Sequence, residues 1–333
     1  MTRVAVLGAG TWGTAFSLVL SDAGQRVALW ARRPELCERI NATHSNSDYL
    51  PGVRLPDSLL ASHDPELVLD QAEVVVLAVP SQSLRTNLEG WAPLLPDGAL
   101  LVSLMKGVEL GSAKRMSEVI AEVTGASAER VAVVTGPNLA REIAARQPAA
   151  SVVACTNREA AQWLQAVCHT PAFRPYTNSD VVGCELAGAT KNVIALAVGM
   201  AVGLGFGDNT RASVITRGLA ETARLGLALG ADQYTFAGLA GLGDLVATCS
   251  SPLSRNRTFG EKLGQGRTVE EISAGTRQVA EGVKSCHSIL DLAVRHDVLV
   301  PIVEHVAAVV SGQLKPHEML VALMSRTARP ERY

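Results

Sequence analysis

The segment Arg3–Gly13 constrains the fold of this chain more than any other, because a short apolar run leads directly into glycines spaced G-x-G-x-x-G. The run Val4–Leu7 is apolar and rich in β-branched valine, as a buried parallel strand requires. Gly8 would allow a tight turn after that strand. Gly10 would let a pyrophosphate approach the backbone, and Gly13 would let the next helix pack closely on the sheet. Together they predict a βα unit that binds a dinucleotide.

The residues after the glycines are expected to form a helix over Ala15–Ala23, whose N-terminal N–H groups would face the phosphates of the cofactor. Glycines meet this spacing by chance in many loops, so a structural turn without a ligand is the alternative. The strand before the glycines and the helix after them favour the dinucleotide site.

The composition is that of a compact globular protein with room for two domains. The chain has 333 residues, of which 47% are hydrophobic and 19% are charged. The formal net charge of −2 provides no basic field for nucleic acid or for an acidic membrane surface. We therefore expect no nucleic-acid partner and no membrane association.

The N-terminus and the cysteines indicate a cytoplasmic location. The chain enters its first strand at once, which leaves no room for a signal peptide, and no apolar stretch is long enough to favour a membrane span. The six cysteines are scattered without a C-x-x-C pair, and the seven histidines form no H-E-x-x-H motif. We expect reduced cysteines and no metal site.

The first half of the chain alternates short apolar strands with helical stretches, which is typical of βαβ units. The expected strands are Val4–Leu7, Val27–Trp30, Val74–Val79, Leu100–Leu104, Val131–Val134 and Ala150–Ala154. This alternation predicts an α/β fold with a Rossmann-like, doubly wound parallel sheet.

The second half loses the strand pattern from about Glu185 and becomes rich in alanine and leucine at helical spacing. The expected helices are Ala187–Gly203, Arg211–Leu229, Val269–Ala274, Cys286–Val294, Ile302–Val310 and Pro316–Met324. We place the boundary near Pro175–Gly183, where Pro, Asn, Ser and Asp break the pattern. This gives a cofactor-binding domain over residues 1–180, an all-helical C-terminal domain over residues 181–333, and a ligand cleft between them.

The end of the second strand indicates which nicotinamide cofactor is preferred. An acidic residue there would bind the adenosine 2′-OH of NAD, but this chain has Arg32 and Arg33. Two guanidinium groups suit a 2′-phosphate. The alternative is a pair of solvated surface arginines. We predict that NADP(H) is preferred and that NAD(H) is used less well.

Two charged residues of the helical half lie in unusually apolar surroundings. Lys191 stands in the apolar stretch Leu186–Val198, where it either extends to a surface or is desolvated with a lowered pKa. A partly desolvated ammonium suits a general acid that protonates a carbonyl oxygen while hydride arrives at carbon. Asp244 lies among glycines and leucines, so its carboxylate needs a partner such as Lys191 or a substrate hydroxyl. The alternatives are an ordinary surface lysine and a helix-capping aspartate.

Two further polar sites suit an anionic substrate. Lys106 follows the strand Leu100–Leu104, at the edge of the sheet where open α/β folds bind ligands. Ser254 is a natural N-cap and is followed by Arg255 and Asn256, so the start of this helix would suit a phosphate. A surface lysine and a plain capped helix with solvated arginines are the alternatives.

Longer motifs give a family resemblance over essentially the whole chain. They are Gly10–Gly13, Tyr49–Gly52, Ala78–Ser81, Lys106–Gly107, Gly136–Pro137, Gly188–Ala195, Gly238–Leu245 and Thr248–Gly260. In these motifs the chain resembles the bacterial NAD(P)H-dependent glycerol-3-phosphate dehydrogenases. The resemblance implies reduction of dihydroxyacetone phosphate to sn-glycerol 3-phosphate, a precursor of phospholipids.

The resemblance also implies roles for residues of the substrate site. Lys191 would be the catalytic proton donor, and Lys106 would orient the substrate. The implied substrate-binding set is Lys106, Gly136, Asn138, Lys191, Asp244, Ser254, Arg255 and Asn256. Asn138 departs from the family's commoner pattern, which has Ser and then Phe after the proline of this loop.

The implied cofactor contacts begin at the glycine loop and extend into the helical half. They are Gly8, Gly10, Thr11, Trp12, Gly13, Arg32, Arg33, Tyr49, Lys106, Ala140, Arg255, Val279 and Glu281. Glu281 would hydrogen-bond the nicotinamide carboxamide, and Ala140 would approach the cofactor through its backbone. A homodimer is expected, because the helical half is apolar and rich in glycine and because the family suggests the same.

Two other functions remain open from the residues alone. A related dehydrogenase that acts on β-hydroxyacids would need a cationic clamp for a carboxylate, whereas the helix start at Ser254–Asn256 suits a phosphate dianion better. A nicotinamide-binding sensor without catalysis should lack a lysine in the apolar helix, where this chain has Lys191. The expected function is therefore an NADP(H)-preferring dehydrogenase of a three-carbon phosphorylated ketone.

Overall fold

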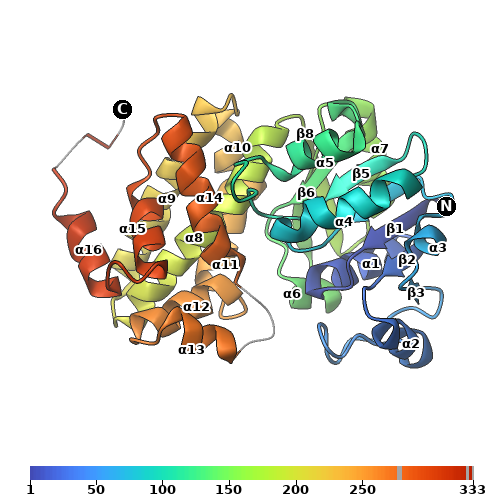
Figure 1. Ribbon diagram of the computed structural model, residues 1–333, viewed down its shortest axis with the longest axis horizontal. Coiled ribbons are helices and arrows are strands. Elements are labelled where there is room, and N and C mark those ends of the chain that lie inside the picture. The colour runs from blue at the N-terminus through green and yellow to red at the C-terminus, as the bar shows by residue number, and fades with distance from the viewer. Residues whose placement is uncertain (276–279, 328–329, 332–333) are drawn as a thin grey trace.

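The computed structural model describes residues 1–275, 280–327 and 330–331, and it places an α/β half beside a helical half (Figure 1). The strands are β1 (Arg3–Leu7), β2 (Arg26–Trp30), β3 (Leu60–Ser62), β4 (Val74–Leu77), β5 (Leu100–Ser103), β6 (Val131–Thr135), β7 (Ala149–Ala154) and β8 (Phe173–Asn178). They form one sheet in the order β3-β2-β1-β4-β5-β6-β7-β8. The strand order reverses between β1 and β4, the point at which open α/β sheets bind their ligands.

The sheet confirms the predicted Rossmann-like architecture and corrects it in detail. β7 runs antiparallel to β6, whereas every other neighbouring pair of strands is parallel. β3 and β8 were not predicted, because β3 has only 3 residues and β8 contains Pro175. β8 is an edge strand, where the missing N–H group of a proline is tolerated.

Helices cover both faces of this sheet, because alternate strand residues supply two separate cores. Val4 and Val6 of β1 pack in one core with Phe16, whereas Ala5 and Leu7 belong to the opposite one. The helices are α1 (Thr11–Asp22), α2 (Pro34–Thr43), α3 (Pro65–Leu69), α4 (Leu84–Trp91), α5 (Met116–Thr124), α6 (Ala140–Ala144) and α7 (Arg158–Cys168), with 3₁₀ turns at Ser81–Ser83, Ala92–Leu94 and Ala128–Arg130.

The C-terminal region is helical throughout the part that the structure describes. Its helices are α8 (Val181–Gly203), α9 (Asp208–Ala228), α10 (Gln233–Ala237), α11 (Asp244–Ser250), α12 (Arg255–Gly264), α13 (Val269–Ala274), α14 (Glu281–Arg295), α15 (Pro301–Val310) and α16 (Pro316–Met324). A π-helical turn, Leu239–Gly243, joins α10 to α11. The sequence pattern did not predict α10, this turn or α11, because they are short and interrupted by glycines.

Helix α8 is the central element of this region, and the other helices surround it (Figure 1). It begins at Val181, earlier than the predicted Ala187, and the side chain of Asp180 caps it by accepting the N–H of Gly183 at 2.8 Å. Its length and hydropathy would suffice to cross a membrane, but 89% of its apolar window is buried inside the protein. That burial identifies it as a core helix.

Glycines bring α12 against α8 at backbone distance. A Cβ at Gly260 would lie 2.1 Å from the carbonyl oxygen of Leu196, and one at Gly199 would lie 2.1 Å from that of Arg257. Only residues without a Cβ permit this approach. The start of α12, which carries the predicted phosphate residues, is thereby held against the helix that carries Lys191.

Candidate active site

The glycine loop between β1 and α1 fits the backbone of a dinucleotide. Gly8 has a φ of +129°, and a Cβ there would lie 2.6 Å from the carbonyl oxygen of Ala78. A Cβ at Gly13 would lie 2.0 Å from the carbonyl oxygen of Gly8, whereas nothing lies within 4 Å of the Cβ position of Gly10. α1 begins at Thr11 without a side-chain cap. An uncapped helix start beneath open space suits a pyrophosphate.

Three of the other predicted cofactor residues lie beside this loop. The hydroxyl of Thr11 donates to the carbonyl oxygen of Tyr49 at 3.1 Å, which brings the Tyr49 segment to the start of α1. The indole N–H of Trp12 is buried and has no hydrogen-bond partner among the residues described. A buried donor without a partner is uncommon in proteins, and a bound ligand would supply one.

The two arginines predicted to read the cofactor's 2′ position are exposed just beyond β2. β2 pairs with β1 up to Trp30, so Arg32 and Arg33 follow the strand next to the glycine loop. Arg33 lies 2.6 Å from the carboxylate of Asp48, which also receives Arg39 at 2.8 Å. The hydrogen bond from Arg33 lowers the pKa of Asp48. Sequence analysis did not include Asp48, because it lies outside the glycine motif.

The helical region buries a cluster of two lysines around one carboxylate, which we call the Lys–Asp–Lys cluster (Lys106, Asp244 and Lys191). Lys191 lies 2.5 Å from one carboxylate oxygen of Asp244 and donates to the hydroxyl of Thr248 at 2.7 Å. Lys106 lies 2.5 Å from the other oxygen and donates to the carbonyl oxygen of Gly136 at 2.9 Å. Asp244 is 1% exposed, so both lysines meet inside the protein rather than in water.

The charges of this cluster do not cancel, because two ammonium groups share one carboxylate. The pKa of Lys106 is lowered to about 8, chiefly by burial; Asp244 opposes the change and the neighbouring Lys191 adds to it. The excess positive charge would attract an anionic substrate, and a lysine pKa near neutrality is typical of functional sites.

Asp244 reaches the lysines through the turn that precedes it. The π-helical turn Leu239–Gly243 ends directly at Asp244, the first residue of α11. A Cβ at Gly241 would lie 2.2 Å from the carbonyl oxygen of Phe236, so this tight turn requires glycine. π-helical turns are frequent at functional sites. Asp244 lies in the first turn of its helix, but its carboxylate is used by the lysines.

The residues predicted to bind phosphate lie at the start of α12, which contacts α8 next to Lys191 through Asn192. Ser254 is the N-cap, as predicted, and accepts the N–H of Arg257 at 3.2 Å. The amide of Asn256 donates to the side-chain oxygen of Asn192 at 2.9 Å and accepts the N–H of Gly282 at 2.9 Å. Asn256 therefore connects α12, α8 and α14. Arg255 is exposed at the first position of α12.

The loop after β6 places Gly136 at the cluster and Asn138 beside it. Gly136 has a φ of +119°, and its carbonyl oxygen accepts from Lys106. Asn138 donates to the hydroxyl of Ser151 at 3.2 Å, while its side-chain oxygen has no partner among the described residues. Ala140 is the first residue of α6. Although Asn138 departs from the family pattern, its side-chain oxygen is thus available to accept a hydrogen bond.

Glu281 begins α14 and belongs electrostatically to the same site. Burial raises its pKa, and the charges of Arg255, Lys106 and Lys191 oppose that rise. A second predicted contact, Val279, lies outside the described residues. The structure therefore brings predicted substrate and cofactor residues from both halves of the chain together.

Thr248 and Asn192 belong to this site although sequence analysis did not select them. Thr248 lies one helical turn after Asp244, on the same face of α11, and Asn192 follows Lys191 directly. Their proximity to the predicted residues was a signal that could have found them.

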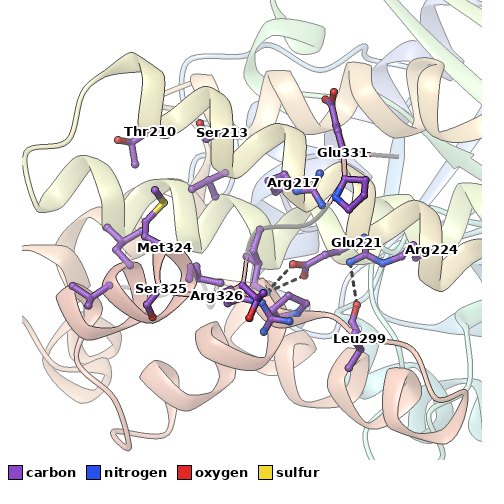
Figure 2. A pocket seen from close by; sticks show the side chains of 18 of the residues that line it. Thr210, Ser213, Arg217, Glu221, Arg224, Leu299, Met324, Ser325, Arg326 and Glu331 are labelled. Atoms are coloured by element: carbon purple, nitrogen blue, oxygen red, sulfur yellow. Dashed lines mark hydrogen bonds between the residues drawn. The ribbon is translucent and has the colours of Figure 1, made fainter. Parts of the chain in front are cut away.

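A large hollow elsewhere in the helical region is not part of this site. It has a volume of about 1630 Å³ and is lined by α9, the segment before α15, α16 and the following residues. Figure 2 shows that its polar residues include Glu221 and Arg224, rather than any residue of the Lys–Asp–Lys cluster. Among the described residues, no group of His, Cys, Asp or Glu could hold a metal ion.

Comparisons with known proteins identify one family over both halves. A model described as NAD-dependent glycerol-3-phosphate dehydrogenase N-terminus matches residues 3–161, and the corresponding C-terminus model matches residues 180–321. The glycerol-3-phosphate dehydrogenase [NAD(P)+] of Streptomyces avermitilis is 64% identical over 330 residues, covering 99% of this chain and 98% of that protein. The enzyme of the same name from Thermobifida fusca is 62% identical over 334 residues, covering 100% of this chain and 99% of its own.

A solved structure supports the same relationship. The crystal structure of glycerol-3-phosphate dehydrogenase from Coxiella burnetii has a TM-score of 0.92 and 36% sequence identity, and the match covers 97% of this chain and 98% of that one. The two family models together span the glycine loop and all three residues of the cluster. The chain therefore belongs to the NAD(P)-dependent glycerol-3-phosphate dehydrogenase family.

Proposed function

We propose that this protein reduces dihydroxyacetone phosphate to sn-glycerol 3-phosphate with NADPH or NADH, and that the Lys–Asp–Lys cluster carries the reaction. The relatives are named for this oxidoreduction and match the chain from end to end. The observation that supports the site is the burial of Lys191 against Asp244 and Thr248, close to the loops that follow β5 and β6. Bound NAD(P)H would supply the hydride.

Lys191 acts as the proton donor in this proposal. Its ammonium is fixed by Asp244 and Thr248, so a third N–H is left for the carbonyl oxygen of the substrate. Proton donation neutralises the alkoxide that forms as the carbonyl carbon is reduced. In the oxidative direction the same nitrogen accepts the proton. Lys106 holds the polar end of the three-carbon unit and pairs with the second carboxylate oxygen of Asp244.

The start of α12 anchors the substrate phosphate. Ser254, Arg255 and Asn256 combine backbone N–H groups, a helix dipole and a fixed positive charge, which together favour a dianion. Anchoring at the phosphate aligns the carbonyl carbon at the other end of the substrate. Gly136 and Asn138 complete the substrate site from the opposite side.

The cofactor lies across the glycine loop in this proposal. Gly8, Gly10 and Gly13 admit the pyrophosphate, and Thr11, Trp12 and Tyr49 surround it. Arg32 and Arg33 favour the 2′-phosphate of NADP(H), although NAD(H) also serves. At the nicotinamide end, the proposed contacts are Lys106, Ala140, Arg255, Val279 and Glu281.

Three further properties complete the proposal. We place the domain division at residues 1–180 and 181–333, because the last strand ends at Asn178 and α8 begins at Val181. We also propose a homodimer that works in the cytoplasm. The apolar, glycine-rich helical region supports the homodimer, and buried free cysteines support a reducing compartment.

The first test follows oxidation of NADPH by absorbance, with purified protein and dihydroxyacetone phosphate. Wild type should consume NADPH, and Lys191→Ala should lose roughly a hundredfold or more in kcat because the proton donor is gone. NADPH binding by the variant, measured by fluorescence, should be unchanged within twofold. A variant that keeps wild-type kcat would exclude Lys191 as the donor.

The same assay separates the proposal from a β-hydroxyacid dehydrogenase. Inorganic phosphate should compete with dihydroxyacetone phosphate, because it occupies the helix start at Ser254–Asn256. If wild type binds NADPH but leaves dihydroxyacetone phosphate untouched, and reduces NADP⁺ when β-hydroxyacids are supplied with it, the assigned substrate is wrong.

A further inference from the structure

The loop that carries Lys106 follows a strand of the sheet and extends onto the helical region. This loop, residues 104–115, joins β5 to α5. Val108 and Ala113 are buried in the core of the helical region. Arg295 of α14 donates to the carbonyl oxygens of Gly111 and Ser112, each at 2.8 Å. At the start of the loop, Leu104 and Met105 still pack in the two cores of the sheet, so Lys106 stands where the loop passes from the sheet onto the helical region.

One face of α8 contacts both ends of the loop. Glu185, Gly188 and Asn192 follow the i, i+3, i+7 spacing that places residues on one side of a helix. The amide of Asn192 donates to the carbonyl oxygen of Lys106 at 3.3 Å. A Cβ at Gly188 would lie 3.4 Å from Cγ of Lys106, so the lysine stem runs along this face of α8 at contact distance.

Both carboxylate oxygens of Glu185 accept hydrogen bonds from residues at the other end of the loop. One oxygen accepts the backbone N–H of Ser117 at 2.7 Å. The second oxygen accepts Nη1 of Arg115 at 2.7 Å and the hydroxyl of Ser117 at 2.5 Å. The Glu185 side chain is only 3% exposed, so these partners must offset the cost of burying its charge.

Glu185 also caps the start of α5. Glu118 accepts the N–H of Arg115 at 2.7 Å, whereas the N–H of Ser117, in the first turn of α5, is accepted by Glu185. The carboxylate of Glu185 thereby ties that helix start to α8. Lys106 and Arg115 stand near opposite ends of one loop, and Arg115 pairs with Val108 in a β-bridge, so a shift at Arg115 would displace the segment that carries Lys106.

We propose that Glu185 is a positioning residue, which holds the loop 104–115 on α8 through Arg115 and Ser117 and thereby keeps Lys106 on Asp244. This inference rests on the proposed role of the Lys–Asp–Lys cluster. Glu185 does not touch the substrate in this scheme. It acts by limiting the distance between the ammonium groups of Lys106 and Lys191, which come from different halves of the chain.

The test is Glu185→Gln, with Glu221→Gln as a matched control. Glu221 is also a buried helix carboxylate that accepts N–H groups at another helix start, those of Ile302 and Val303, and it is remote from the cluster. Both variants lose a buried charge at a helix N-terminus. Only Glu185→Gln should lower kcat/KM for dihydroxyacetone phosphate, by roughly tenfold or more, with KM for NADPH unchanged within twofold.

The pH profile supplies a readout that a purely structural role would not move. Lys106 is faced by Asp244, Lys191 and Glu281, and its pKa of about 8 depends on burial. A loosened loop admits water, so the pKa of Lys106 should rise toward its ordinary value. The alkaline limb of kcat/KM, which belongs to the coupled cluster, should then move to higher pH in Glu185→Gln and stay in place in Glu221→Gln.

Two outcomes are separable. If Glu185→Gln loses thermal stability but keeps wild-type kcat/KM and the wild-type alkaline limb, Glu185 is only structural and the inference is wrong. If wild type itself does not reduce dihydroxyacetone phosphate, the proposed function fails instead. Should Glu185→Gln not fold, Ser117→Ala replaces it, because it removes one donor to the carboxylate and should shift the limb in the same direction by a smaller amount.

Discussion

At the scale of single residues, this protein gathers charged side chains in two clusters in which the positive charges outnumber the negative ones. The Lys–Asp–Lys cluster has two cations for one anion, and Asp244 is almost fully buried. Where we propose that the adenosine of the cofactor binds, the ratio of two cations to one anion repeats, because Asp48 pairs with both Arg33 and Arg39. In each place the excess positive charge would be neutralised by an anionic group of the substrate or cofactor.

The arginines after β2 carry a prediction about cofactor choice. Arg33→Ala should raise KM for NADPH by roughly tenfold and leave KM for NADH unchanged within twofold, because only NADPH has a 2′-phosphate to lose a charged hydrogen bond. Steady-state kinetics with each cofactor measure this. Arg26→Ala, at the exposed opposite end of the same strand, is the control. Equal changes in KM for NADPH and NADH would mean that Arg33 does not bind the 2′-phosphate.

At the scale of elements, glycine contacts fix the helices that bear the site. α12 rests on α8 through Gly199 and Gly260, and Gly203 and Gly264 repeat the contact one turn later, with Cβ positions 2.1 and 2.3 Å from carbonyl oxygens of the facing helix. The residues proposed to bind phosphate at the start of α12 and Lys191 on α8 are thereby held at a fixed separation.

Gly260→Ala should destabilise the protein by about 1–3 kcal/mol, since the new Cβ would collide with the carbonyl oxygen of Leu196 and force the two helices apart. Urea unfolding measures the change. Gly90→Ala, at an exposed position of α4 with no atom within 4 Å of its Cβ, should instead be neutral or stabilising. Equal stability of the two variants would show that α8 and α12 can separate freely.

At the scale of the whole molecule, long-range ties unite elements that are distant in sequence. Glu185 joins α8 to α5, and Glu221 on α9 accepts the N–H groups of Ile302 and Val303 at the start of α15 (Figure 2). Both carboxylates are buried, and burial raises the pKa of Glu221 to about 7. Global stability should therefore depend on pH near neutrality.

The sign of that dependence follows from proton binding. Because the pKa of Glu221 is higher in the folded protein than in the unfolded chain, the folded state binds more protons between pH 7 and 4.5 and gains stability as pH falls. Relative to Glu221→Gln, wild type should gain about 2 kcal/mol between pH 8 and pH 5.5. Urea unfolding at the two pH values measures this. A difference between the proteins that is independent of pH would contradict it.

Local pattern sufficed for much of this protein. The G-x-G-x-x-G loop, the apolar strands, the long helices and the N-cap Ser254 all follow from rules that act over a few residues, and the structure contains them. The sequence pattern did not predict β3 and α11 because they are short, and it did not predict β8 because this edge strand contains Pro175. The sequence pattern also did not predict that β7 is antiparallel, since strand direction is set by the path of the chain and not by side-chain pattern.

The sequence by itself determined the fold class, the family motifs and which side chains could take part in chemistry. Only the tertiary structure decided which of them meet. Lys106, Lys191 and Asp244 lie far apart in the chain, and their convergence depends on a loop of the sheet that packs into the helical core. Burial, which sets the pKa of Lys106, exists only after that packing, because a local sequence pattern does not specify the distance to water.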